Sequence, residues 1–258
     1  NAAIAALPAN KSNNGRATAY TAHALLGKVY LFQDKFDDAA TILEPLIGLY
    51  TLPSSLQSVF LNSGENGSES VFEIQHSKDS NWWDWGFPQG SEGSFAVIHH
   101  GPRGYNGSVY ASGWSFNVPT QDLYDSFDVN DTRRGVAILD IDNWATSTGA
   151  EYSKGYEHTG YFNHKYIPRT GQTAAQSELN YEVNFRAIRY ADVLLMAAEA
   201  NNRKTSPSDA KARNYLNQVR FRAFGNNSRA SSSTGSSLTK EIVLSISINI
   251  PITERKIT

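Results

Sequence analysis

Residues 22–47, AHALLGKVYLFQDKFDDAATILEPLI, contain the periodicity that decides the fold. Two apolar stripes with helical spacing run through this stretch, and a polar break at residues 33–35 separates them. The first stripe comprises Ala22, Leu25, Leu26, Val29 and Tyr30, and the second comprises Phe36, Ala39, Ala40, Leu43, Leu46 and Ile47. The pattern predicts a helix pair over about residues 16–47, with Asp34 as the N-cap of the second helix.

Small and aromatic residues in this pair are spaced as in a tetratricopeptide (TPR) repeat. Leu26-Gly27, Tyr30, Phe36 and Ala39 occupy the corresponding positions. Small residues there allow two antiparallel helices to approach closely, and one repeat needs neighbours to bury both its faces. A second helix pair is predicted over about residues 190–224. Its stripes comprise Ala191, Leu194, Leu195 and Ala198, and then Leu216, Val219 and Ala223.

Composition excludes several classes of function. The 258 residues include 23 Lys and Arg against 25 Asp and Glu, so the chain has no basic field that would attract nucleic acid. The chain contains no cysteine, which excludes disulfides, thiolate metal sites and a cysteine nucleophile. Aromatic residues make up 12% of the chain, and many of them lie in polar, glycine-rich sequence. Their placement is the first indication of function.

A large insertion of about residues 62–185 separates the two helix pairs. Residues 70–76 and 161–167 are predicted strands, and residues 119–127 are a predicted short helix. Residues 78–118 have no helical period, but their aromatic content favours an ordered loop over disorder. We therefore expect a single, mainly α domain over residues 1–258. It would consist of TPR-like helix pairs, an irregular aromatic-rich insertion with minor β structure, and an uncertain tail at residues 226–258.

The aromatic side chains in the segment 78–118 are candidates for binding sugars. Sugar rings present flat patches of C–H bonds, and indole and phenol rings offer apolar platforms that match them. Residues 81–85 (NWWDW) contain Trp82, Trp83 and Trp85, and we expect at least one of these indoles to contact a glycan. The alternative is that they pack the loop onto the scaffold. The remaining candidates, for which local packing is the stronger alternative, are Trp114, Tyr105, Tyr110 and Arg103.

The sequence predicts no metal site, cofactor or catalytic residue. His99 and His100 are adjacent and have no third ligand at a supporting spacing, so we expect them to pack or to form hydrogen bonds. Asp192 and Glu199 lie about two turns apart on one predicted helix, which suits pairing with arginines better than general acid–base catalysis. No nucleophile-elbow, phosphate-loop or dinucleotide motif occurs.

The chain resembles the SusD/RagB outer-membrane lipoproteins of Bacteroidetes glycan-uptake systems over residues 1 to about 225. The matching segments are Leu7-Pro8, Gly15-Arg16-Ala17-Thr18, residues 24–31 (ALLGKVYL), residues 119–124 (PTQDLY), residues 131–133 (DTR), Lys165-Tyr166, residues 184–186 (NFR), residues 189–195 (RYADVLL), residues 198–200 (AEA) and residues 216–223 (LNQVRFRA). The chain has Asp131-Thr132-Arg133 where the family usually has Asp-Pro-Arg. It also lacks the family's N-terminal half with its lipidated cysteine, and residues 243–258 look unrelated. We therefore expect an internal or C-terminal piece of a longer protein.

The resemblance implies a non-enzymatic glycan-binding protein on a TPR-based helical scaffold. Its ligand would be an oligosaccharide or polysaccharide, held by an arc of aromatic side chains. Its partner would be a SusC-like TonB-dependent outer-membrane transporter, which the protein covers as a lid. Its location would be the cell-surface side of the outer membrane, through a lipid anchor outside this chain.

Two other functions remain open at this point. The first is a TPR-type protein-interaction scaffold whose aromatic insertion contacts protein partners. The second is a glycoside-active enzyme, for which Asp84 and Glu92 are the local carboxylate pair. Neither the identity of the glycan nor that of the transporter follows from the residues.

Overall fold

The computed structural model describes residues 1–9, 14–79, 92–155, 157–173, 179–225 and 238. The chain forms two compact units. The first comprises residues 1–55, 66–73 and 186–258, and the second comprises residues 56–65 and 74–185. Most of the predicted insertion therefore folds as the second unit, and the two predicted helix pairs belong to the first.

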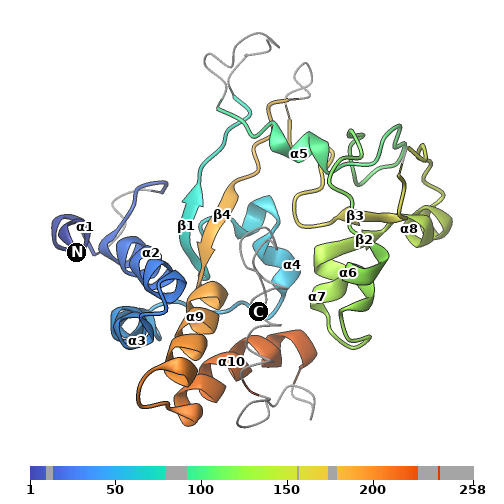
Figure 1. The fold of residues 1–258 in the computed structure, drawn as a ribbon. Helices are drawn as coiled ribbons and strands as arrows, with labels where there is room; N and C mark the ends of the chain where they lie inside the picture. Colours follow the sequence, from blue (N-terminus) through green and yellow to red (C-terminus); the bar gives the residue numbers. More distant parts are fainter. Residues whose placement is uncertain (10–13, 80–91, 156, 174–178, 226–237, 239–258) are drawn as a thin grey trace. The chain divides into compact units, whose positions relative to one another are not determined.

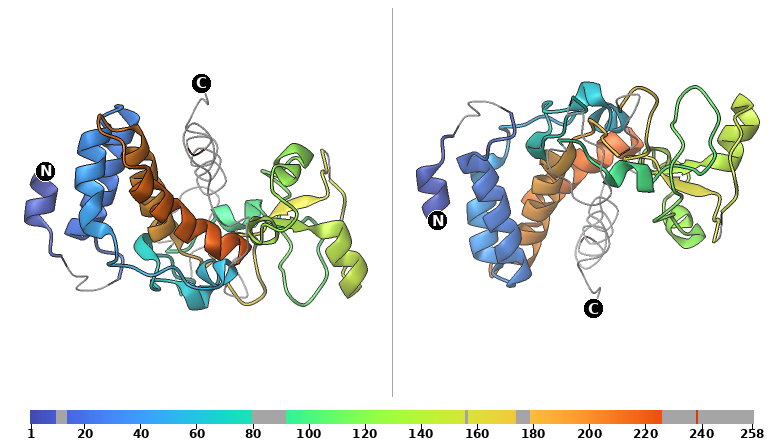
Figure 2. Two further views of the ribbon diagram at one scale, coloured as in Figure 1. Left: turned by 90° about the horizontal axis from the view of Figure 1, so that it is seen from below. Right: turned by 90° about the horizontal axis from the view of Figure 1, so that it is seen from above.

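The first unit contains both predicted helix pairs. Its elements are α1 (Ala2–Ala6), α2 (Ala19–Phe32), α3 (Phe36–Leu43), a short 3-10 helix (Glu44–Leu46), β1 (Ser70–Ile74), β4 (Phe185–Arg189), α9 (Tyr190–Arg203) and α10 (Asp209–Phe224). Helix α2 packs on α3, α3 packs on α9, and α9 packs on α10 (Figures 1 and 2). Strands β1 and β4 form a two-stranded sheet, and β4 leads directly into α9. The predicted mainly helical, TPR-like architecture is confirmed.

The buried face of α2 is made of small residues. Ala24, Gly27 and Leu31 are buried, whereas Leu25 and Val29 of the predicted apolar stripe are exposed. A Cβ added at Gly27 would lie 2.4 Å from Cδ2 of Leu43 on α3, so only glycine allows the two helices to pack at this distance. The prediction of a helix is confirmed, and Tyr30 of its stripe packs against the core. Leu25 and Val29 were wrongly expected on the buried face, because close packing there selects small residues such as Ala24 and Gly27.

Asp34 does not cap α3, contrary to the prediction. Helix α3 begins at Phe36 after Lys35, and no side chain forms a capping hydrogen bond there. Asp34 instead has a φ of 55°, and its backbone N–H bonds to the carbonyl of Leu31 as α2 ends. A short polar side chain tolerates this left-handed conformation better than most residues do. The turn between the helices is therefore built by the end of α2, not by the start of α3.

Buried ion pairs join the elements of the first unit. Arg189 pairs with Glu69 at 3.1 Å and with Asp192 at 2.8 Å, and Arg222 of α10 also pairs with Glu69. Glu199 pairs with Arg203 at 2.7 Å, one turn along α9. Asp192 and Glu199 thus form the arginine pairs that the sequence favoured over a catalytic role.

The second unit consists of short elements joined by long connections. These are α4 (Leu56–Val59), a 3-10 turn (Asn62–Gly64), α5 (Ala96–His99), α6 (Gln121–Asp125), α7 (Arg133–Ala137), β2 (Ile138–Asp140), α8 (Ile141–Thr148) and β3 (Tyr161–Asn163). Strands β2 and β3 pair antiparallel with Leu139 opposite Phe162. The predicted short helix at residues 119–127 is confirmed as α6, and the strand predicted at residues 161–167 is limited to β3.

Several small cores stabilise the second unit instead of one large core. One surrounds Phe162 and Ile141 beside β2 and β3, and another joins Ile98 of α5 to Tyr181.

Among the described residues, no helix combines the length and the apolar character that crossing a membrane requires.

Candidate functional site

An exposed group of aromatic rings lies on the second unit. We call Phe95, His99, Trp114 and Phe116, together with Arg103, the aromatic cluster. His99 is its centre: the imidazole centroid lies 6.0 Å from Phe95, 5.0 Å from Trp114 and 5.8 Å from Phe116. Phe95 is 58% exposed and Phe116 is 50% exposed, while His99 and Trp114 are half-buried. The cluster therefore presents two ring faces to solvent over a packed base.

The backbone of residues 113–116 holds the aromatic cluster against the end of α5. The N–H of Trp114 donates to the carbonyl of Ile98 at 2.9 Å, and the N–H of Phe116 donates to the carbonyl of His99 at 2.8 Å. The last carbonyls of a helix have no partner within the helix, so these bonds satisfy them. Trp114 also packs against the small core that contains Ile98 and Tyr181. The exposed rings are thus fixed from below by buried contacts.

Two glycines allow this close approach of the backbones. A Cβ at Gly113 would lie 2.4 Å from the Cα of Gly101 and 2.5 Å from the carbonyl oxygen of Ile98. A Cβ at Gly101 would lie 2.4 Å from Cγ of Pro168. Any larger residue at either position would push the segment that carries Trp114 and Phe116 away from α5.

Arg103 contacts both Trp114 and Phe116 at the edge of the cluster. Its guanidinium carbon lies 5.8 Å from the ring centre of Phe116, and its Nε and Nη2 donate to the carbonyl of Trp114 at 3.1 and 2.9 Å. Ser115, between the two aromatic residues, has a φ of 57° and accepts a hydrogen bond on Oγ from the backbone of Arg103. Left-handed backbone at a non-glycine residue is strained, and such strain concentrates at ligand-binding surfaces.

His100, the residue that follows α5, carries a neutral side chain. Burial lowers the pKa of its imidazole to about 4, and the neighbouring His99 acts in the same direction. Its Nδ1 is buried without a hydrogen-bond partner among the described residues. The imidazole is therefore uncharged at neutral pH.

The structure places the predicted site residues in three different settings. Trp114 and Arg103 belong to the aromatic cluster. Trp82, Trp83 and Trp85 lie outside the described residues, as does Asp84 of the alternative carboxylate pair. Tyr105 and Tyr110 are 8% and 3% exposed and pack into the core beside β2 and β3.

Tyr105 and Tyr110 form internal contacts that account for their burial. The hydroxyl of Tyr105 accepts a hydrogen bond from Nε1 of Trp144, and the hydroxyl of Tyr110 lies 2.9 Å from Nε2 of His164. Their rings meet edge to face at 5.7 Å. This is the local packing that the sequence left as the alternative, and neither residue offers an open ring face in the structure.

Sequence reasoning did not select Phe95, His99 or Phe116 for this site. A signal for them exists in their spacing. Phe95 and His99 lie four residues apart at a short helix, so they share one side. Trp114 and Phe116 flank the left-handed Ser115, and their ring centres lie 6.0 Å apart. The sequence does not show that α5 pairs with residues 113–116. This pairing depends on Gly101 and Gly113.

The remaining polar residues of the described structure do not assemble a metal centre. No group of three or more His, Asp or Glu side chains among them is placed to hold a metal ion. The His99 ring packs against three aromatic neighbours, as the packing interpretation expects.

Comparison with known proteins shows the fold and what the chain resembles. Residues 140–245 match the model of the SusD family. The chain superposes on the surface glycan-binding protein A from Bacteroides thetaiotaomicron, in complex with laminarihexaose, with a TM-score of 0.81 and 29% identity, over 93% of this chain and 54% of that one. The chain is similar to proteins of the SusD family.

Two further relatives show how much of a SusD-family protein is present. A laminarin-binding SusD-like protein has 34% identity and a TM-score of 0.80, and the match covers 95% of this chain and 56% of that one. SusD-like protein P2 of Formosa agariphila is 29% identical over 84% of this chain and 44% of its own length. The chain therefore spans about half the length of the relatives that it matches.

Proposed function

We propose that this SusD-family chain binds glycan without cleaving it, and that the aromatic cluster is one of its contact surfaces. The observation that carries the proposal is the exposed pair of ring faces at Phe95 and Phe116, fixed on a packed base. Rigid aromatic faces bind the C–H patches of sugars at a low cost in conformational entropy.

A β-1,3-glucan is the ligand that we infer. Two structures resemble this chain over more than 90% of its length: a laminarin-binding SusD-like protein, and a surface glycan-binding protein in complex with laminarihexaose. Glucose units are uncharged, and the aromatic cluster is mostly apolar. Arg103 at its edge has its Nε and Nη2 engaged with Trp114, which leaves Nη1 to meet sugar hydroxyls.

The family also supports a place and a partner for the complete protein. We infer that it acts on the cell-surface side of the outer membrane, held there by a lipid anchor, and that it delivers glycan to a SusC-like TonB-dependent transporter. Binding without chemistry suits this role, because the ligand must be released intact for transport.

The proposal is tested by titrating the chain with laminarihexaose. Isothermal titration calorimetry measures binding, and chromatography of the same mixture measures new reducing ends. Cellohexaose, with β-1,4 linkages, serves as the matched ligand. We expect heat with laminarihexaose, little with cellohexaose and no new reducing ends. Release of shorter sugars would instead support a glycoside-active enzyme, and absence of binding to both hexaoses would contradict the proposed ligand.

A protein-interaction role is the second candidate, and one observation favours it. Leu25, Val29 and Phe32 are all exposed at helical spacing along α2 of the first unit. Exposed apolar stripes of this kind mark contact surfaces. Charged substitutions of Leu25 and Val29 that leave laminarihexaose binding intact, but abolish co-purification with a transporter, would assign partner contact to this helix.

A further inference from the structure

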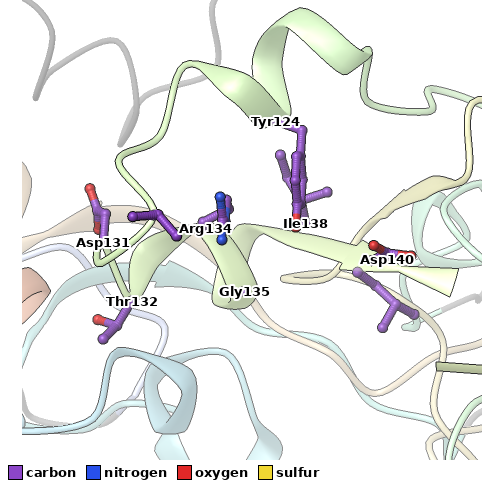
Figure 3. Close-up of a pocket in the computed structure, with 9 residues that line it drawn as sticks. Tyr124, Asp131, Thr132, Arg134, Gly135, Ile138 and Asp140 are labelled. Carbon is purple, nitrogen blue, oxygen red and sulfur yellow. The ribbon is translucent and has the colours of Figure 1, made fainter. Parts of the chain in front are cut away.

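A separate pocket of the second unit has the chemistry of an acceptor site. It lies between α6, the turn that precedes α7, and β2 (Figure 3). Its volume is about 380 Å³, at the small end of the range for ligand pockets. The lining residues are Tyr124, Val129, Asp131, Thr132, Arg134, Gly135, Ile138, Leu139 and Asp140. A cavity of this size suits one sugar unit rather than a chain.

Arg134 supplies the positive charge of this pocket. Its guanidinium carbon lies 4.7 Å from the ring centre of Tyr124, and the two side chains lie beside each other in Figure 3. Tyr124 in turn stacks on Tyr161 of β3, with ring centres 4.4 Å apart and planes 15° apart. The hydroxyl of Tyr161 donates to Oε1 of Gln121 at 3.2 Å. The guanidinium is therefore held against a braced aromatic pair.

The donors of Arg134 are unused within the described part of the chain. Its side chain forms no ion pair and no hydrogen bond to any described residue, although it is half-buried. A guanidinium carries five N–H donors in a planar fork that matches a carboxylate. The site is thus preorganised for a planar, negatively charged acceptor.

The carboxylates that line the pocket do not compete for Arg134. Asp131 accepts from Nε and Nη2 of the buried Arg133, at 2.9 and 2.6 Å. Asp140 accepts from the backbone N–H and from Nδ2 of Asn143, at 3.0 and 2.6 Å, and caps α8. Each carboxylate oxygen has a second lone pair, so Asp140 retains the capacity to accept a hydrogen bond from a hydroxyl group. In Figure 3, Asp140 and Arg134 lie on opposite sides of Ile138.

We propose that this Arg134 pocket is a second carbohydrate site that binds the carboxylate of a uronic-acid unit. Arg134 pairs with the carboxylate of the sugar, and Asp140 accepts a hydrogen bond from one of its hydroxyls. Recognition of a carboxylate follows from the unused donors of the Arg134 guanidinium. Recognition of a sugar rests on the proposed glycan-binding function. The pocket thereby adds recognition of charge to a chain whose aromatic cluster suits neutral sugar faces.

The test uses two sugars that differ only at C6. Saturation-transfer NMR compares methyl glucuronide, which has a carboxylate, with methyl glucoside, which has a hydroxymethyl group; acetate is the third probe. We expect binding of the glucuronide and much weaker binding of the glucoside and of acetate. Equal binding of the glucoside would overturn recognition of the carboxylate. Equal binding of acetate would overturn recognition of a sugar.

Substitutions locate the site. Arg134→Gln should weaken glucuronide binding about 10- to 100-fold, as expected for loss of hydrogen bonds to a charged group, and Arg134→Lys should weaken it less. Lys154→Gln removes an exposed cation of the same unit that pairs with Asp142, and should leave binding unchanged. Glucuronide binding that survives Arg134→Gln would place the site elsewhere and overturn the proposal.

Laminarihexaose separates this inference from the proposed function. Arg134→Gln should leave laminarihexaose binding intact, because the aromatic cluster is a different surface. A chain that binds glucuronide through Arg134 but not laminarihexaose would keep the pocket and contradict the β-1,3-glucan ligand. A chain that binds laminarihexaose but not glucuronide would keep the β-1,3-glucan ligand and contradict the Arg134 pocket.

Discussion

The Cα of Gly101 and the Cα of Gly113 lie so close that a methyl group on Gly113 would come within 2.4 Å of Gly101. This contact brings the end of α5 against the segment that carries Trp114 and Phe116. The aromatic cluster thus depends on two residues that have no side chain. Its geometry is set by backbone packing beneath the rings and not by the rings themselves.

Replacement of Gly113 by alanine should destabilise the second unit. The added methyl group meets backbone atoms of Gly101 and Ile98, which cannot move as a side chain can. Overpacking of this kind costs about 1–3 kcal/mol or more in the free energy of unfolding. Urea denaturation measures the change. The matched control is Gly135→Ala in α7, where nothing lies within 4 Å of the new Cβ and helix propensity favours alanine. Equal losses in both variants would contradict the role of the glycine pair.

Phe116→Ala should weaken laminarihexaose binding and leave the fold intact. The ring is half exposed, so its removal costs little core packing, whereas a ring face that contacts sugar contributes on the order of 1–3 kcal/mol. Calorimetric titration and thermal melting measure the two effects. Phe32→Ala removes a similarly exposed ring from α2 and should not change affinity. A large fall in melting temperature with unaltered affinity would show that Phe116 is a packing residue.

His100 should make the protein less stable as the pH falls below about 6.5. Burial lowers the folded-state pKa of this imidazole to about 4, so between pH 6.5 and 4 the unfolded chain binds more protons than the folded chain. The neutral imidazole contributes fully to the free energy of unfolding above pH 6.5, and this contribution declines by on the order of 2 kcal/mol by pH 4.5. Urea denaturation at both pH values should show a smaller loss in His100→Asn than in the original chain. An identical loss in both proteins would contradict the assignment.

Asp131→Ala should be among the most destabilising substitutions in the second unit. Asp131 and Arg133 are both buried and form a two-bonded ion pair, so removal of the carboxylate leaves a buried guanidinium without its partner. Breaking such a pair costs about 3–5 kcal/mol. Lys154→Gln breaks an exposed pair with Asp142, which is worth about 0–1 kcal/mol. Chemical denaturation that ranks the two variants equally would show that Arg133 finds another partner.

Helix positions could be predicted from the sequence because they follow from local periodicity. The two pairs around residues 16–47 and 190–224 are present as α2, α3, α9 and α10. Local periodicity did not determine which face of α2 is buried. Gly27 is buried against Leu43 while Leu25 is exposed, because the approach of a neighbouring helix selects the small side chains.

Only part of the proposed aromatic cluster could be selected from the sequence. Trp114 and Arg103 were selected by residue type, since flat rings and hydrogen-bond donors are what sugars require. Tyr105 has the same chemistry and is buried. Residue type does not distinguish the two outcomes, because exposure depends on which segments pack over each ring.

The amino-acid sequence by itself determined the helices, the likeness to the SusD family and the aromatic character of the insertion, because each of these depends on the order of neighbouring residues. Only the tertiary structure decided which rings face solvent, how Gly101 and Gly113 bring Phe95 and Phe116 to one surface, and that Arg134 lies in a pocket beside Tyr124. These features depend on contacts between segments far apart in the chain, and the packing of the whole unit, not local preference, sets their geometry.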